Sequence, residues 1–110
     1  MKKLLRSWCL IATVLFAGHP ALAHKVNLFA YVEAGTVYAE SYFPDGTKVN
    51  SGKVLVYDSQ GHLLLEGQTD EEGRYSFPIP KVDGLEIVID ASMGHRNSFK
   101  LKKSEVVAGQ

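Results

Sequence analysis

The sequence predicts an all-β domain, a seven-stranded antiparallel β-sandwich. Three observations predict it. Apolar and polar residues alternate with a period of two, turn signals recur about every 8–12 residues, and the apolar stripe of a long helix is missing. We expect the strands at residues 26–33, 36–43, 53–57, 62–68, 74–77, 85–91 and 97–101.

Turn-forming residues separate these segments. Gly35 follows the first segment, and Pro44-Asp45-Gly46-Thr47 follows the second. Proline presets φ in such a turn, aspartate caps it, and glycine accepts a positive φ. Gly61 and Gly73 mark the two hairpin turns that come next, and the proline-containing residues 78–84 read as a loop.

The first 23 residues have the pattern of a secretory signal peptide. Lys2, Lys3 and Arg6 precede an apolar run, and Ala21-Leu22-Ala23 provides the small residues that signal peptidase reads. We therefore expect residues 1–23 to be removed, residues 24–101 to form the β-sandwich domain, and residues 102–110 to be a tail that frays. The expected location is the periplasm.

Removal of the signal changes the charge and the cysteine content of the domain. Three basic residues and no acidic residue leave with it, so the remaining chain is mildly acidic, which argues against a nucleic-acid partner. Cys9 also leaves, so neither a disulfide nor a thiolate metal site is expected. No second apolar run follows, so we expect no membrane span after cleavage.

His24 would become the first residue of the exported chain. Its free α-amine and its imidazole Nδ1 could close a chelate ring on one divalent metal ion. Both groups have reference pKa values close to neutrality, about 7.7–8.0 for the amine and about 6.5 for imidazole. Two nitrogen donors suit Ni(II), Co(II), Cu(II) or Zn(II). The alternative is that a histidine merely follows the cleavage point.

His95 is the candidate for a further metal ligand. If consecutive strands run antiparallel, the turn Met93-Gly94-His95-Arg96 lies at the same end of the sandwich as the start of the first strand. The turn that contains His62 lies at the opposite end by the same argument. We therefore take His24 and His95 as the predicted metal site and His62 as a surface residue. An exposed loop histidine is the alternative for His95.

Other possible ligands have simpler structural interpretations. We expect Met93 to be a core side chain at the end of its strand, although its thioether would suit Cu(I). The acidic residues are expected to cap turns or to face solvent. They are Asp45, Asp70, Glu71, Glu72 and Asp90.

Four aromatic residues fall on the strand face opposite to Val26, Leu28, Val37 and Ala39. Either both faces of these strands are covered, or one face carries an exposed aromatic patch that would suit docking onto a partner protein. We expect core packing for at least half of them. They are Phe29, Tyr31, Tyr38 and Tyr42.

Motifs of enzymes are missing from the sequence. It contains no Gly-x-Ser-x-Gly elbow, no phosphate-binding glycine loop and no His-Glu-x-x-His pair. We therefore expect a protein that is not an enzyme.

Residues 45–80 resemble the carboxypeptidase regulatory-like domains. The resemblance rests on Asp45-Gly46-Thr47, on Gly52-Lys53-Val54-Leu55-Val56-Tyr57-Asp58, on Gly61, and on residues 69–77, Thr-Asp-Glu-Glu-Gly-Arg-Tyr-Ser-Phe. It implies a prealbumin-like, Ig-like sandwich. It implies little about function, because such domains act as spacers or as binding platforms.

Two segments flanking this core, residues 23–30 and Met93-Gly94-His95-Arg96, extend the resemblance to nearly the whole exported chain. The chain is similar to the periplasmic accessory components of energy-coupling-factor-type nickel and cobalt uptake systems. This resemblance implies an exported protein that presents Ni(II) or Co(II) to a membrane transporter subunit, with His24 and His95 as the matching positions. The alternatives are a periplasmic copper-binding protein, which would bind Cu(II), and a β-sandwich interaction module without metal.

Overall fold

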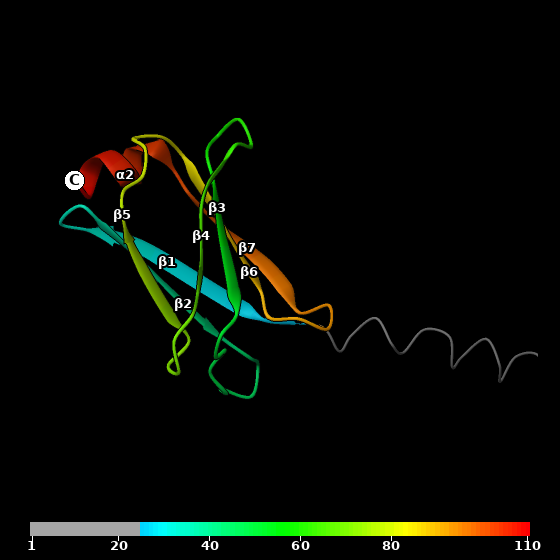
Figure 1. Cartoon of the computed structure of the whole chain (residues 1–110). Coiled ribbons are helices and arrows are strands. Elements are labelled where there is room, and N and C mark those ends of the chain that lie inside the picture. The colour runs from blue at the N-terminus through cyan, green and yellow to red at the C-terminus, as the bar shows by residue number, and fades with distance from the viewer. Residues whose placement is uncertain (1–24) are drawn as a thin grey trace, which may run out of the picture.

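The computed structural model describes residues 25–110, which form two antiparallel sheets packed face to face (Figure 1). One sheet has three strands in the order β1-β2-β5, and the other has four in the order β4-β3-β6-β7. The predicted seven-stranded antiparallel sandwich is confirmed. The strands are β1 (Asn27–Glu33), β2 (Thr36–Tyr42), β3 (Lys53–Tyr57), β4 (Leu63–Gln68), β5 (Arg74–Pro78), β6 (Leu85–Asp90) and β7 (Arg96–Leu101).

Strand bounds agree with the sequence prediction to within one residue at each end. The agreement is close because glycine and proline interrupt the alternation at each turn. The β1–β2 turn, for example, has positive φ at Ala34 (49°) and at Gly35 (81°). A short turn of this kind joins two antiparallel strands directly and sets their register, in which Tyr31 lies opposite Tyr38.

The core lies between the two sheets. The central strands β3 and β6 contribute Val54, Val56, Ile87 and Ile89, whose side chains are fully buried. They come from alternate positions of each strand, as the geometry of a strand requires. From the three-stranded sheet, Ala30, Val37, Ala39 and Phe77 close the other side of the core.

Gly67 of β4 allows a close approach between the edges of the two sheets. A Cβ atom at this position would overlap the ring of Tyr75 on β5. Tyr75 is half buried and packs against the core cluster. A glycine in a strand often marks such a contact, because any side chain there would displace the neighbouring group.

The C-terminal segment differs from the sequence prediction. Residues 102–110 were expected to fray, but Lys103–Ala108 form a helix, α2, that packs on the sandwich (Figure 1). Val106 is fully buried, and the Gly35 N–H donates a 2.8 Å hydrogen bond to the Gly109 carbonyl. A helix of this length shows too few apolar positions for a period to be recognised, so its place depends on one valine and on contacts with the β1–β2 turn.

Among residues 25–110, no helix has the length and apolar character needed to cross a membrane.

Adjacent valines in α2 test whether this segment is part of the folded domain. We expect Val106→Ala to lower the free energy of unfolding by about 2 kcal/mol, because a buried side chain is truncated and leaves a cavity. Val107 is 48% exposed, so Val107→Ala should change stability by less than about 0.5 kcal/mol. Urea denaturation measures both. Equal effects of the two substitutions would show that the helix is not docked.

Candidate functional site

The loops gather at two ends of the sandwich, as the antiparallel alternation predicts. The β2–β3 loop, the β4–β5 turn and the β6–β7 turn lie at the end where β1 begins, which we call the N-terminal end (Figure 1). Contacts join them there: Ser51 donates a backbone hydrogen bond to Thr69, and the Phe43 and His95 rings meet edge to face, with centroids 5.3 Å apart. The β3–β4 turn, the β5–β6 loop and α2 occupy the opposite end.

A side-chain hydrogen bond holds the residues just before β1 against β7. The Asn97 amide nitrogen donates a 2.8 Å hydrogen bond to the carbonyl of Val26, whose own side chain is buried. Residues 25–26 therefore lie beside the β6–β7 turn. His24, the first residue of the predicted metal site, lies outside the described residues, and the structure places its neighbour Lys25 at this end.

His95 closes the β6–β7 turn. Its backbone carbonyl accepts a hydrogen bond from Ala91 at 2.8 Å, and its backbone N–H donates to Ser92 at 2.9 Å. The side chain is half buried and has the Phe43 ring against one side. The backbone thus holds this histidine at the N-terminal end.

Met93 is not the core side chain that we expected. It lies at the tip of the β6–β7 turn and is 85% exposed. Ser92, Met93 and Gly94 have φ of 70°, 51° and 82°, so three consecutive residues adopt the left-handed region. This reversal turns the Met93 side chain away from the sheet, and the thioether lies two residues from His95.

Three aspartates of the N-terminal end cap turns, as was predicted for Asp45. Asp45 accepts a hydrogen bond from the Thr47 N–H at 2.9 Å, and Asp90 accepts one from the Ser92 N–H at 3.0 Å. Asp70 accepts from the backbone of Arg74 and of Glu72, and these bonds lower the pKa of its carboxyl group. Residues 25–110 contain no group of three or more His, Cys, Asp or Glu arranged for a metal ion.

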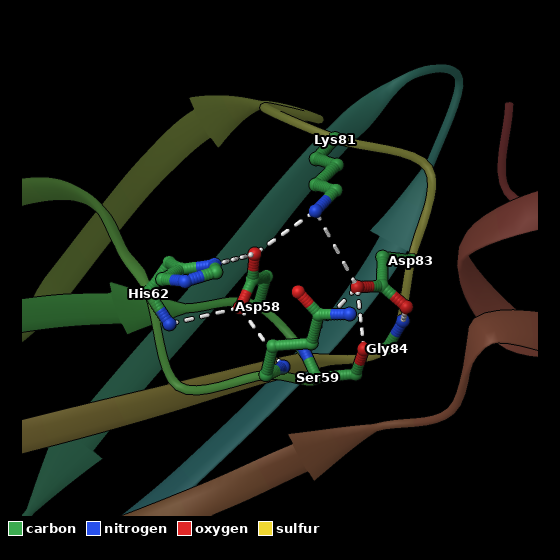
Figure 2. A network of polar contacts seen from close by, with 7 residues as sticks. Asp58, Ser59, His62, Lys81, Asp83 and Gly84 are labelled. Carbon is green, nitrogen blue, oxygen red and sulfur yellow. Dashed lines mark hydrogen bonds and ion pairs between the residues drawn. The ribbon is translucent and has the colours of Figure 1, made fainter.

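A network of polar contacts occupies the opposite end (Figure 2). The carboxylate of Asp58 is buried and accepts hydrogen bonds from the backbone of Gln60 and His62, each at 2.9 Å. The Lys81 ammonium lies 2.9 Å from Asp58 and 3.9 Å from Asp83. The network thereby ties the β3–β4 turn to the β5–β6 loop.

His62 belongs to this network and lies at the end opposite to His95, as predicted. Its ring Nδ1 is 3.1 Å from Asp58, and its side chain is 70% exposed. The hydrogen bond from Lys81 holds the pKa of Asp58 far below its usual range, with the backbone of His62 as the next cause. Asp58 likewise raises the pKa of Lys81. The network stabilises a loop pair, and sequence reasoning missed it because Lys81 is 23 residues away from Asp58.

Four exposed aromatic residues form what we call the aromatic face, on the outer side of the three-stranded sheet. Phe29, Tyr31, Tyr38 and Tyr42 are between 38% and 50% exposed. The Tyr31 and Tyr38 rings stack with centroids 5.2 Å apart, and Phe29 meets Phe99 edge to face at 5.6 Å. The expectation that at least half of them pack in the core is wrong, because smaller side chains already fill the inner face.

Beside the stacked tyrosines lies a hollow of about 500 Å³, which we call the tyrosine hollow. It extends from β1 across β2 to β5. Its lining consists of Tyr31, Tyr38, Ala39, Glu40, Asp70, Arg74, Tyr75 and Ser76.

Comparison with known proteins gives a relative without a described function. The chain is 32% identical over 92 residues to an uncharacterized protein of Haemophilus influenzae (strain ATCC 51907 / DSM 11121 / KW20 / Rd). The match covers 78% of this chain and 57% of the relative, so the chain spans little more than half of the relative's length. No family model and no solved structure matches the chain.

The Asp58 network predicts a specific dependence of stability on pH. Because the pKa of Asp58 is lower in the folded chain than the value of about 3.9 expected when unfolded, its contribution is present above that value and is lost as the pH falls below it. We expect Asp58→Asn to lower the melting temperature at pH 7, with the difference from the native chain shrinking below about pH 4.

Thermal melts followed by circular dichroism from pH 7 to pH 2 measure this effect. Asp45→Asn is the matched control: the Thr47 hydrogen bond also lowers the pKa of Asp45, but Asp45 is exposed and has no ion-pair partner among the described residues, so its loss should have a smaller effect. A difference between the native chain and Asp58→Asn that stays constant with pH would contradict the assignment to the charged carboxylate.

Proposed function

We propose that this protein is an exported accessory protein that binds Ni(II) or Co(II) and presents the ion to a membrane transporter subunit. The amine and imidazole of His24, as the first residue after signal cleavage, would bind the ion together with His95. The supporting observation is the Asn97–Val26 hydrogen bond, which holds the start of the described chain beside the turn that carries His95. The resemblance to accessory components of nickel and cobalt uptake systems supports the same proposal.

The reach of the chain is compatible with a shared site. His24 precedes Val26 by two residues, which span at most roughly 7 Å when extended. Val26 is hydrogen-bonded to Asn97, itself two residues from His95. Both histidines are therefore within two residues of the same hydrogen bond, which is compatible with their binding one ion.

The proposed donor set suits transfer of the metal. An amine and two imidazoles supply three nitrogen ligands and leave coordination positions open to water or to a receiving ligand. Asp45, Asp70 and Asp90 at this end each hold their own turn through the carboxylate oxygen Oδ1, and the proposed site does not require them as ligands. An open site of this kind releases its ion to a partner more readily than a closed one.

Copper is the second candidate cargo, and the exposure of Met93 is the observation that favours it. A thioether is a soft ligand that prefers Cu(I), and here it lies on the same turn as His95. Cu(II) also binds nitrogen sites more tightly than nickel or cobalt does, so affinity by itself does not identify the cargo.

Calorimetric titration tests the proposal. Ni(II), Co(II) and Cu(II) are titrated into the exported protein after mass spectrometry has verified that it begins at His24, and into a form with one extra residue ahead of His24. We expect one-to-one binding that collapses in the extended form, because the added residue removes the histidine's free amine. Metal binding should also weaken below about pH 6, where protons compete with the metal for the amine and imidazole nitrogens of His24.

Two histidine variants test whether His95 is the second metal ligand or whether the loss of any histidine weakens binding. His95→Ala should weaken binding by at least about tenfold, whereas His62→Ala at the opposite end should leave it unchanged. Equal binding by the native and extended forms, or no binding by either, would overturn the metal proposal. The remaining alternative would be a β-sandwich interaction module without metal.

A further inference from the structure

The tyrosine hollow and the aromatic face lie on a surface that the proposed metal site does not use. Tyr31 and Tyr38 are directly opposite each other in the β1–β2 register, and Phe29 precedes Tyr31 by two residues on the same strand face. The register of two paired strands holds these rings in place, so little conformational freedom remains to be lost when a ligand binds.

Charged groups around the hollow are paired with one another. Glu40 lies 3.6 Å from Lys48 and 3.8 Å from Arg74, and Arg74 lies 3.0 Å from Glu72. All four side chains are more than a third exposed, so they keep hydrogen-bonding capacity toward solvent. Each cation faces a carboxylate, and the remaining acidic group of the lining, Asp70, accepts hydrogen bonds from the backbone of its own turn. Among the described residues, the surface therefore has no unpaired cation for an anionic ligand, and its carboxylates are already engaged by cations or by backbone N–H groups. It offers planar donors and acceptors next to aromatic rings.

The edge of the sheet beside the hollow is poorly suited to an added peptide strand. The backbone of Arg74 is already engaged by the β4–β5 turn, with its carbonyl accepting from Asp70 at 2.9 Å and its N–H donating to the Asp70 carboxylate at 3.0 Å. Pro78, at the other end of β5, has no N–H to donate. A ligand of this hollow is therefore bound through side chains.

We infer that the tyrosine hollow binds a neutral oligosaccharide. The apolar C–H face of a pyranose ring packs on aromatic side chains, and its neighbouring hydroxyls match paired planar groups such as those of Glu40 and Arg74. The hydroxyl of the exposed Ser76 adds a further polar contact. A volume of about 500 Å³ lies within the range of small-ligand sites and holds one or two sugar rings. Phe29 and Tyr42 extend the aromatic face beyond the hollow for a longer chain.

NMR titration of the isotope-labelled exported protein, which begins at His24, tests this inference, with cellohexaose, chitohexaose and maltohexaose as the uncharged probes. We expect saturable shifts from at least one of them, centred on Tyr31, Tyr38, Glu40 and Ser76. Tyr38→Ala should weaken that binding by about five- to tenfold, because a ring contact is lost, while Tyr38→Phe should keep most of it.

The controls show whether sugar binding is independent of the metal site. They also show whether a loss of binding results from unfolding of the variant. Leu63→Ala removes an exposed apolar side chain from the other sheet and should leave sugar binding unchanged, as should blocking of the N-terminus. Retained amide-shift dispersion shows that Tyr38→Ala is folded. The inference is overturned if no probe gives saturable shifts, if the shifts survive Tyr38→Ala, or if they depend on protein concentration alone, which would indicate a second copy on this face.

Discussion

Mutual burial of two sheet faces is the constraint on which the other features of this domain depend. Val54 and Ile89 lie opposite each other in register, and both are fully buried between the sheets. Because side chains alternate along a strand, filling the inner face sends the intervening residues outward. On β1 and β2 the outward residues include the four aromatics, which is why a face rich in large rings lies in solvent beside a core of smaller side chains.

The two ends of the sandwich differ in how their loops are held. At one end, a buried carboxylate with an ammonium and two backbone donors joins the β3–β4 turn to the β5–β6 loop. At the other end, turn-capping carboxylates and the Asn97–Val26 bond hold the backbone, and His95 and Met93 remain on a turn with left-handed residues. In the first arrangement, the carboxylate and the ammonium are paired with each other. The second places the His95 and Met93 side chains on one turn beside the start of the described chain.

Much of the fold was predictable from the sequence, and less of the candidate site. Alternation and turn residues predicted every strand, and antiparallel connection placed His95 and His62 at opposite ends. Periodicity does not say which of two apolar strand faces turns inward, so the aromatic residues were misjudged. Met93 was misjudged because positive φ at a non-glycine residue leaves no sequence signal. The helix at 103–108 was missed because one buried valine makes no pattern.

The sequence by itself determined the class of fold, the strand bounds and the end of the sandwich at which each turn lies, because these follow from local alternation, turn chemistry and strand parity. Only the tertiary structure decided which side chains meet across long sequence separations. The Lys81–Asp58 pair, the Asn97–Val26 bond and the tyrosine hollow between β1, β2 and β5 all join segments that are distant along the chain. Such contacts depend on how the two sheets are packed and on which edges meet, and the periodicity of a single strand carries no information about either.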